Sequence, residues 1–350
     1  MKYRRLGKTN LDVSVIGLGT WQFGGEWGID YKQKEVDAIF NKAEETGINF
    51  IDTAECYGDH LSEEFIGAAI EKNRDRWVLA TKFGHKFHDL YERTRHYKAE
   101  DVQKQLEDSL RALRTDYIDI YQFHSGTDEE FDNDALWTML DKQVEAGKIG
   151  HIGLSISKND NTYQTKHAAD IGAKSMQIVY NRLDRTPEEE VFSLCEEQDL
   201  GVMARVPMAS GYLSGKYKPG AVFADNDVRH RHDKEETRKK LEMVETLYNT
   251  EVPEGVPMSQ WALAWCLKHP AVSTVIPGCK NPEQVEANAK AAELILLQQT
   301  IHRPCRNKWK RVPQSRDPLF CQKTFTALCF SYNERFCILE KVQYIVKAGY

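Results

Sequence analysis

The sequence has neither an excess of positive charge nor a long apolar run. Its 350 residues include 47 Lys or Arg and 53 Asp or Glu, which gives a formal net charge of −6. No apolar segment reaches the roughly 18 residues that a membrane-spanning helix needs, and the basic N-terminus leads into no apolar signal segment. Because nucleic-acid-binding domains usually present a basic surface, we expect neither a nucleic-acid partner nor a membrane partner. A cytoplasmic location is expected.

The sequence also has no cysteines paired at short spacing. Its eight cysteines are at positions 56, 195, 266, 279, 305, 321, 329 and 337, and no two form a Cys-x-x-Cys motif. A disulfide framework is typical of small secreted domains, which this chain does not resemble in size. We therefore expect free thiols in a reducing compartment.

A third absence is the glycine-rich turn of open dinucleotide-binding sheets. Such sheets usually have about five or six strands and a Gly-x-Gly-x-x-Gly turn after the first. Here the first predicted strand ends in Gly17-Leu-Gly-Thr-Trp21, which lacks that spacing. Short β-branched and aromatic runs instead alternate with helical patterns, and the predicted strands are 15–20, 49–54, 77–83, 118–124, 151–157, 175–181, 201–207 and 272–278. Eight strands, each followed by a helix, indicate an α/β fold of the closed (β/α)8 type, a TIM barrel.

Both ends of the chain depart from this alternation. Residues 1–13 predict an N-terminal β-hairpin that turns near Thr9-Asn10 and plugs the barrel floor. From Leu297 to Tyr350 the chain has ten Lys or Arg and three Asp or Glu, and its apolar residues follow no sustained period. We therefore predict a barrel domain over residues 1–296 and an atypical, basic, cysteine-containing and loosely ordered C-terminal extension over 297–350. Translation of an out-of-frame sequence is an alternative explanation of the extension.

Ionisable residues lie at the ends of three successive predicted strands. Asp52 ends the second strand and Tyr57 follows it, while Lys82 and His124 end the third and fourth. The active sites of parallel barrels lie at the C-terminal ends of the strands, so these side chains should share one rim. Each of them alone could equally belong to a structural ion pair or a packed core.

The four residues together suit proton donation to a carbonyl oxygen. A free tyrosine has a pKa near 10, and the ammonium of Lys82 would lower the pKa of Tyr57 by about one to three units. Asp52 would keep Lys82 charged and oriented, and His124 would hydrogen-bond the substrate oxygen. The set therefore predicts general acid catalysis by Tyr57.

Beyond these single residues, positions 1 to about 295 resemble the aldo-keto reductase superfamily. The similar stretches are Leu6–Asn10, Ile16–Thr20, Asn49–Gly58, Thr81-Lys82, His124 and Ile276–Gly278, in the order and spacing of that family. The resemblance implies reduction of aldehydes and ketones by NADPH, with a small-molecule carbonyl compound as substrate. It also implies that Asp52, Tyr57, Lys82 and His124 form the catalytic tetrad.

The same resemblance implies a set of cofactor-binding residues. Ser155 and Gln177 match the positions that hold the nicotinamide carboxamide, and the loop 207–216 resembles the one that covers the pyrophosphate. Lys280 would contact the 2′-phosphate of NADP, and Gln284 with Asn288 would hold the adenosine. The implied set is Ser155, Gln177, Arg205, Pro207, Ser210, Gly211, Leu213, Gly215, Lys216, Gly278, Lys280, Gln284 and Asn288.

Two positions depart from the family pattern. Arg205 stands where many members have an aromatic residue stacked on the nicotinamide, although a planar guanidinium can also stack. Ala287 stands where an acidic residue often precedes the last Asn. The expected preference for NADP over NAD therefore depends mainly on Lys280, and the sequence predicts neither the physiological carbonyl compound nor the oligomeric state.

Two other functions fit parts of the pattern. A barrel aldolase would use Lys82 as a Schiff-base nucleophile, although the adjacent Asp52 opposes the neutral lysine that this reaction needs. A non-catalytic, NADP-binding regulatory subunit would bind the nucleotide without turnover.

Several neighbouring residues are weaker functional candidates. His85, His88 and His96 follow the third strand, but no carboxylate or thiol completes a zinc set, so no metal site is predicted. We expect the Cys56 thiol to be packed, and the run Arg229–His232 to be a solvated part of a long loop. Trp21, Phe23 and Trp27 suit an apolar wall over the substrate, with core packing as the alternative.

Overall fold

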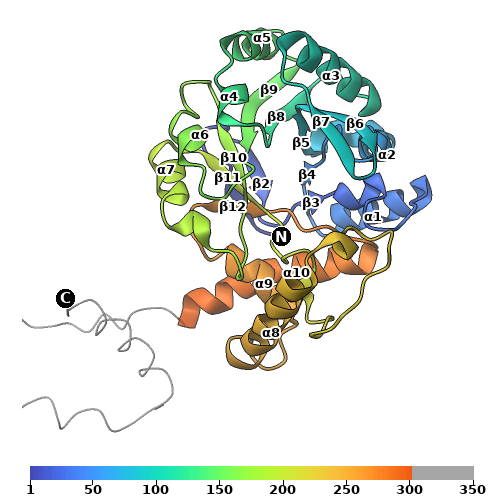
Figure 1. Cartoon of the computed structure of the whole chain (residues 1–350), viewed down its shortest axis with the longest axis vertical. Coiled ribbons are helices and arrows are strands. Elements are labelled where there is room, and N and C mark those ends of the chain that lie inside the picture. The colour runs from blue at the N-terminus through green and yellow to red at the C-terminus, as the bar shows by residue number, and fades with distance from the viewer. Residues whose placement is uncertain (302–350) are drawn as a thin grey trace, which may run out of the picture. The chain divides into compact units, whose positions relative to one another are not determined.

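The computed structural model describes residues 1–301 of the chain, and side-chain burial to residue 294. Eight parallel strands form one sheet in the order β12-β11-β10-β9-β8-β5-β4-β3. Their bounds are β3 Leu18–Gly19, β4 Phe50–Asp52, β5 Val78–Phe83, β8 Ile118–His124, β9 Ile149–Ser155, β10 Ser175–Val179, β11 Gly201–Arg205 and β12 Val272–Val275. Parallel bridges Ile16–Val275 and Gly19–Gly278 join the first strand to the last. The sheet therefore closes into the predicted (β/α)8 barrel (Figure 1).

The barrel strands are covered on both faces. All residues of β4 and β12 are buried, and so are most residues of β8 and β9. Near-continuous apolar runs are typical of parallel strands that lie between a barrel interior and an outer helical layer. Each of the eight predicted strands appears in the structure, and the observed strands are mostly one to three residues shorter at an end.

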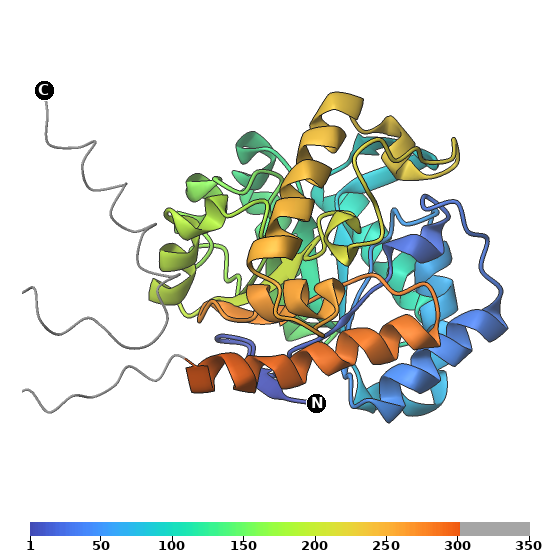
Figure 2. The same cartoon turned by 90° about the horizontal axis from the view of Figure 1, so that it is seen from below.

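The helices form the outer layer of the barrel. They are α1 Gln33–Glu45, α2 Leu61–Ile70, α3 Ala99–Ala112, α4 Asp128–Phe131, α5 Asp134–Glu145, α6 Thr162–Lys166, α7 Val191–Glu197, α8 Lys234–Thr250, α9 Met258–Cys266 and α10 Pro282–Ile301. In α3 the buried residues Val102, Leu106 and Leu110 recur at four-residue spacing and face the sheet, as expected for an amphipathic helix. Helix α10 lies beside α1 and α9 on the outside of the barrel (Figure 2).

The N-terminal hairpin plugs the barrel, as predicted. Strands β1 (Tyr3–Arg5) and β2 (Asp12–Ser14) pair antiparallel. Leu6 and Val13 are fully buried in one cluster with the barrel-interior residues Phe50, Ala80 and Ile120. Apolar side chains from the hairpin thus complete the interior of the barrel.

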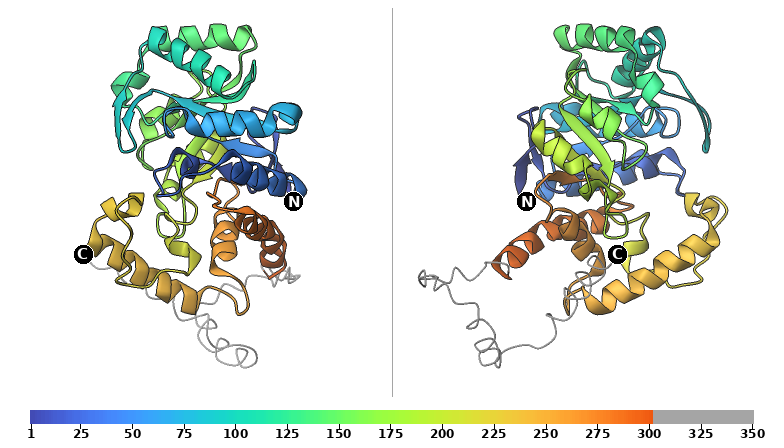
Figure 3. Two further views of the ribbon diagram at one scale, coloured as in Figure 1. Left: turned by 90° about the vertical axis from the view of Figure 1, so that its right-hand side faces the viewer. Right: turned by 60° about the vertical axis from the view of Figure 1, so that its left-hand side comes forward.

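Two elements, a hairpin and a helix, are additions to the predicted alternation of eight strands and eight helices. The loop after β5 forms an antiparallel hairpin of β6 (His85–Asp89) and β7 (Glu92–Arg95). Its residues are mostly exposed and polar, so no buried stripe marked them as strands. The second element, α8, lies outside the barrel (Figure 3) and packs Leu241 and Val244 into a cluster with Tyr212 and Trp261.

Residues 302–350 lie outside the described part of the chain. The predicted domain boundary at residue 296 and the predicted extension 297–350 therefore stay predictions, while α10 itself continues to Ile301. The four cysteines of the described residues are free and buried. None of the described helices is long and apolar enough to cross a membrane.

Candidate active site

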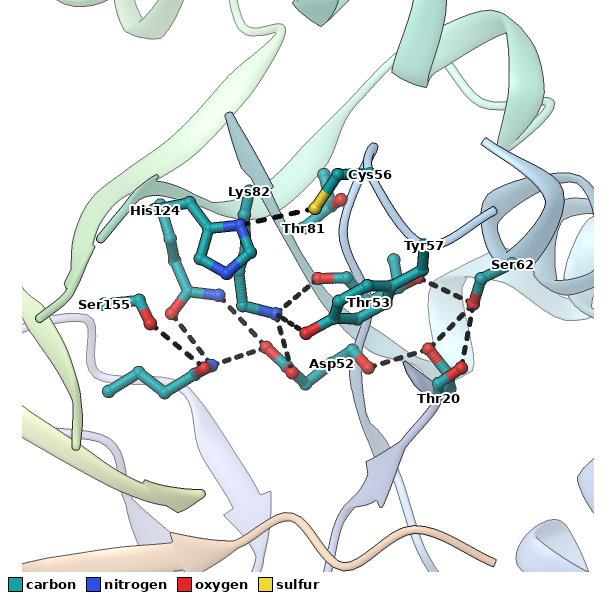
Figure 4. A network of polar contacts seen from close by, with 12 residues as sticks. Thr20, Asp52, Thr53, Cys56, Tyr57, Ser62, Thr81, Lys82, His124 and Ser155 are labelled. Carbon is teal, nitrogen blue, oxygen red and sulfur yellow. Dashed lines mark hydrogen bonds and ion pairs between the residues drawn. The ribbon is translucent and has the colours of Figure 1, made fainter. Parts of the chain in front are cut away.

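The four predicted catalytic side chains meet at the C-terminal end of the barrel. Asp52 and His124 are the last residues of β4 and β8, Lys82 is the penultimate residue of β5, and Tyr57 lies in the loop between β4 and α2. Figure 4 shows the four side chains close together, with the Lys82 amine between Asp52 and Tyr57. Parallel strands with aligned register place these ends side by side, since β4 pairs with β5 and β5 with β8.

Lys82 is the central donor of the site. Its Nζ donates to Asp52 Oδ2 at 2.8 Å, to the Thr53 carbonyl at 2.6 Å and to Tyr57 Oη at 3.3 Å. The side chain is fully buried. Burial alone would lower the pKa of Lys82, but the charge and hydrogen bond of Asp52, with Tyr57, raise it above its ordinary value. Lys82 is therefore held as an ammonium that points at the phenol oxygen.

Asp52 is fixed by a pair of buried amides. Its Oδ1 accepts from Gln177 Nε2 at 2.6 Å and from Gln122 Nε2 at 3.2 Å, and Gln177 Nε2 also donates to Gln122 Oε1 at 3.1 Å. Gln122 was missed in the sequence. Its signal was its position two residues before His124 on one strand, because such residues face the same side.

The predicted direction of the Tyr57 pKa shift is wrong in this structure. Lys82 does act to lower the pKa of Tyr57, but burial of the side chain outweighs it and raises the pKa to about 12. The position of Lys82 at a strand end correctly predicted a positive charge near Tyr57. It could not reveal how completely the phenol of Tyr57 would be buried. The Tyr57 phenol therefore keeps its proton at neutral pH.

His124 is also neutral. Burial, together with the neighbouring His85 and Lys82, lowers the pKa of His124 well below its ordinary value. The ring lies edge-on to that of Tyr57, with centroids 6.3 Å apart. A neutral imidazole beside the phenol can hydrogen-bond an uncharged substrate oxygen without adding a second cation next to Lys82.

One cavity of about 490 Å³ opens over these side chains. Asp52, Tyr57 and His124 line one part of it. Ten of the thirteen predicted cofactor residues line it as well, and these are Gln177, Arg205, Pro207, Ser210, Gly211, Lys216, Gly278, Lys280, Gln284 and Asn288. Residues from β10, β11 and the start of α10, far apart in sequence, thus converge on the space above Tyr57.

The other three predicted cofactor residues lie just outside the cavity lining. Ser155 Oγ is hydrogen-bonded to Gln177 Oε1 at 3.2 Å, so it supports a lining residue. Leu213 is fully buried in the cluster beneath α8, and a Cβ at Gly215 would lie 3.4 Å from Met258 Cβ. Leu213 and Gly215 could meet a ligand only through their backbone groups, if the loop moved.

Arg205 ends β11 and faces the cavity between the amide pair and the loop 206–211. One guanidinium nitrogen donates to the Ile156 carbonyl at 3.1 Å, while Nε has no partner among the described residues. Burial lowers the pKa of Arg205 below its ordinary value. A buried planar cation is thus available at the position where an aromatic ring was expected from the family pattern.

The far end of the cavity is cationic. Lys216, Arg229 and Lys280 all line it. Burial, followed by the charge of Arg229, lowers the pKa of Lys280, and Lys216 acts in the same direction. Arg229 is only 6% exposed and is paired with Asp227, so the expectation that the run 229–232 is solvated is wrong for this residue.

The aromatic residues after β3 divide between the cavity and the core. Trp21 and Trp27 line the cavity, with ring centroids 5.3 Å apart at nearly a right angle. Phe23 is 1% exposed and packs edge-on against Tyr31. The predicted apolar wall therefore consists of the two tryptophans, and Phe23 belongs to the core.

The comparison with known families identifies the chain. The model of the aldo/keto reductase family matches residues 15–309, which include the barrel and every residue of the site. The chain belongs to the aldo/keto reductase family. Members of this family are oxidoreductases that act on carbonyl and alcohol groups with nicotinamide cofactors, so the predicted family, fold and enzyme class are confirmed.

Similar proteins agree with this assignment over most of their length. The oxidoreductase YqkF of Bacillus subtilis is 33% identical over 83% of this chain and 91% of its own. The aldo-keto reductase yakc [NADP(+)] of Schizosaccharomyces pombe is 30% identical over 85% of this chain and 88% of its own. The structure of the aldo-keto reductase AKR11C1 from Bacillus halodurans in its holo form has a TM-score of 0.70, with 31% identity over 84% of this chain and 91% of that one.

Proposed function

We propose that this protein reduces aldehydes or ketones to alcohols with NADPH, and that Tyr57 is the general acid. The observation that carries the proposal is the position of the Tyr57 hydroxyl, 3.3 Å from the buried ammonium of Lys82 and beside the cavity. NADPH, when bound, supplies the hydride that adds to the carbonyl carbon. The protein must then supply a proton to the carbonyl oxygen.

Tyr57 is suited to give up that proton only as charge develops on the substrate. With its pKa raised to about 12 by burial, the phenol keeps its proton in the resting site. As the carbonyl oxygen becomes an alkoxide it becomes a stronger base than a phenolate, and the proton moves from Tyr57 Oη to it. The ammonium of Lys82 then stabilises the phenolate, which is the electrostatic role of a preorganised charge.

Asp52 and His124 position the reacting groups. Asp52 keeps the Lys82 ammonium pointing at Tyr57, and the two amides fix the carboxylate in turn. The neutral His124 ring, on the other side of the cavity floor, can donate a hydrogen bond to the substrate oxygen. Trp21 and Trp27 form an apolar part of the cavity wall, which suits a carbonyl compound with an apolar substituent.

The charge of the cavity lining suits NADPH. Lys216, Arg229 and Lys280 gather at one end, and only Arg229 has a carboxylate partner among the described residues, Asp227. Burial, followed by the charges of neighbouring cations, lowers the pKa of Lys280, and an anionic phosphate would relieve the repulsion among these cations. Gln284 Oε1 already accepts from the backbone N–H of Lys280 at 2.9 Å. We therefore propose that Lys280 contacts the 2′-phosphate and that Gln177 and Ser155 hold the carboxamide.

The geometry disfavours a Schiff-base aldolase. Each of the three Lys82 protons has an oxygen partner, and Asp52 raises the pKa of the amine. Forming the neutral nucleophile would break this set of hydrogen bonds. A non-catalytic regulatory subunit would bind the same nucleotide, but it would not need the buried ion pair of Lys82 and Asp52 next to Tyr57.

Replacing Tyr57 by Phe tests the proposed reaction. The variant removes only the hydroxyl, so we expect kcat for NADPH-dependent reduction of an aromatic aldehyde to fall by about 10²–10⁴. NADPH affinity, followed by protein fluorescence, should stay close to that of the parent protein. Tyr121→Phe is the matched control, because Tyr121 is a fully buried tyrosine on β8 whose hydroxyl has no partner among the described residues.

Three outcomes separate the hypotheses. Loss of turnover in Tyr57→Phe but not in Tyr121→Phe supports Tyr57 as the acid. Unchanged turnover in Tyr57→Phe would show that another group donates the proton. NADPH binding by the parent protein with no turnover on any aldehyde or ketone would instead favour the regulatory subunit.

A further inference from the structure

A cluster of potential metal ligands lies directly beside His124. Glu55, Cys56, His85 and His124 offer ligand atoms that all lie within 4.8 Å of one another. No sequence motif joins them, because the thiol and carboxylate come from the loop after β4 while His85 begins β6. His88 and His96, which share its loop, do not belong to the cluster.

Two polar atoms of the cluster have no partner among the described residues. Glu55 is 3% exposed, and its Oε2 accepts no hydrogen bond from this part of the chain. The other carboxylate oxygen accepts from the backbone N–H of His85 at 2.9 Å. The Nδ1 atom of His85 is likewise buried without a partner. Buried polar atoms are nearly always paired, so these two groups indicate that something else can occupy the space between them.

The separations in the cluster are close to those of a tetrahedral zinc site. Zn–S and Zn–N bonds of about 2.3 and 2.0–2.1 Å place the sulfur and nitrogen ligands of one ion about 3.6 Å apart. Cys56 Sγ lies 3.7 Å from His124 Nδ1. His85 Nδ1 and Glu55 Oε1 are 3.8 Å apart, so a small inward movement of the side chains would suffice. One thiolate, two imidazoles and one carboxylate are also a donor set that suits zinc better than a hard cation.

We propose that Glu55, Cys56, His85 and His124 bind one zinc ion, and that this ion inhibits the reductase. Binding replaces the Cys56 thiol proton by a Zn–S bond and releases that proton to solvent. The imidazole of His124 would then be held through Nδ1, which ties the proposed substrate-binding ring to the metal. The inhibitory part of this inference depends on the proposed function, whereas the binding part does not.

The cluster is partly exposed at its two histidines. The side chain of His85 is 15% exposed and His124 lines the cavity, whereas Cys56 is only 1% exposed, so an ion would reach the thiol last. Arg93 of β7 is one of the nearby cations that oppose metal binding, together with Lys82 and Arg95. The charge of Arg93 is paired with the buried carboxylate of Glu26 at 2.5 Å, which weakens the repulsion between Arg93 and a bound cation.

Binding can be measured without any assay of activity. Titration of the full chain with Co²⁺ as a spectroscopic probe should give a thiolate-to-metal absorption band and visible bands of tetrahedral cobalt, which Zn²⁺ abolishes by displacement. Cys56→Ala should lose one equivalent of this signal. Cys195→Ala is the matched control, since Cys195 is a fully buried cysteine on α7 outside the cluster. Cysteines beyond residue 301 are present in all variants and cancel in the comparison.

His85→Ala gives a second variant at a partly exposed position. It should also lose the cobalt signal, so the proposal remains testable if Cys56→Ala folds poorly. Equal cobalt stoichiometry in the parent protein, Cys56→Ala and His85→Ala would overturn the site.

Inhibition is measured separately. Zn²⁺ should reduce turnover of the parent protein, a chelator should restore it, and Cys56→Ala should need at least about tenfold more Zn²⁺ for half-inhibition, relative to its own metal-free rate. Cobalt binding without inhibition by Zn²⁺ would overturn the regulatory role alone. If the parent protein proved inactive with every carbonyl compound, the proposed reduction would fail while the cobalt titration still decided the metal site.

Discussion

At the scale of single residues, the proposed acid Tyr57 shows two opposing electrostatic effects of unequal size. The nearby ammonium of Lys82 favours the phenolate, and loss of solvent disfavours it. The net pKa of about 12 lies about two units above the ordinary value of tyrosine, which corresponds to about 3 kcal/mol against ionisation. Lys82 therefore reduces, but does not remove, the cost of forming the phenolate in the closed site.

Lys280 allows a residue-scale prediction about cofactor choice. Lys280→Met removes the charge but keeps a similar length of apolar stem. If Lys280 contacts the 2′-phosphate, we expect the Kd for NADPH to rise about tenfold to a hundredfold, since hydrogen bonds to charged groups contribute about 1.5–3 kcal/mol. Affinity for NADH, which lacks this phosphate, should change little. Titration of protein fluorescence with each cofactor measures both effects.

Lys290→Met is the control for this charge change. Lys290 lies on the same helix, α10, but its side chain is 55% exposed and paired with Glu286. It should leave both affinities unchanged. Equal weakening of NADPH and NADH binding in Lys280→Met would show that Lys280 has no contact specific to the 2′-phosphate.

At the scale of elements, the catalytic loop depends on a close contact between two backbone segments. Gly24 ends the 3-10 helix η1 (Trp21–Gly24), which also carries Trp21. A Cβ at Gly24 would lie 2.6 Å from the carbonyl carbon of Tyr57 and 2.7 Å from the backbone nitrogen of Gly58. The two segments therefore approach closely only because residue 24 has no side chain, and we expect this approach to position Tyr57 relative to Lys82.

Gly24→Ala should consequently impair catalysis through the backbone. The added methyl must push the Tyr57 loop away, and misplacing a reacting group by about 1 Å can cost about 10²-fold in rate. We expect kcat to fall by at least about tenfold, with a loss of about 1–3 kcal/mol in the free energy of unfolding. Steady-state kinetics and urea denaturation measure the two quantities.

Gly147→Ala provides the comparison for this element. Gly147 has a φ of 76°, and no atom of the described residues lies within 4 Å of the point that a Cβ would occupy there. It precedes β9, at the opposite end of the barrel from the cavity. The variant should lose stability through backbone strain and keep its kcat. Equal turnover in Gly24→Ala and the parent protein would contradict the positioning role of the contact.

At the scale of the whole molecule, the barrel closes around side chains from outside the eight-stranded sheet. Leu6 is fully buried among barrel-interior residues. Its hairpin packs tightly against Gly201 at the start of β11, where a Cβ would lie 2.6 Å from Leu6 Cγ. The hairpin therefore contributes to the same core as the strands that carry the site, although it lies at the other end of the barrel.

Leu6→Ala should destabilise the whole barrel without changing the site. Deleting a fully buried leucine side chain costs about 2–5 kcal/mol, so the midpoint of urea denaturation should fall markedly. At low temperature, where the variant is still folded, kcat should match the parent protein. Lys8→Ala, at an exposed position of the same hairpin, should stay within about 0.5 kcal/mol. A smaller loss in Leu6→Ala than in Lys8→Ala would show that the hairpin does not stabilise the barrel.

The barrel and the common position of the four rim side chains could be predicted from the sequence because both depend on local pattern. Buried strands such as β8 are marked by short runs rich in β-branched and aromatic residues, and parallel connection places Asp52, Lys82 and His124 at the same end. Gln122 could also have been found, since it precedes His124 by two residues on one strand. The polar hairpin β6–β7 could not, because its exposed strands carry no hydrophobic period.

The sequence by itself determined the order of strands and helices, the residue types at their ends and, through family motifs, the chemistry expected there. Only the tertiary structure decided how deeply each of these groups is buried, and burial controls the direction of the Tyr57 pKa. It also decided which distant residues meet, such as Glu55, Cys56 and His85, or Lys216, Arg229 and Lys280. The physical reason is that hydrophobic period is encoded within a few neighbouring residues, whereas solvent exclusion and charge proximity depend on loops that fold over the barrel from separate parts of the chain.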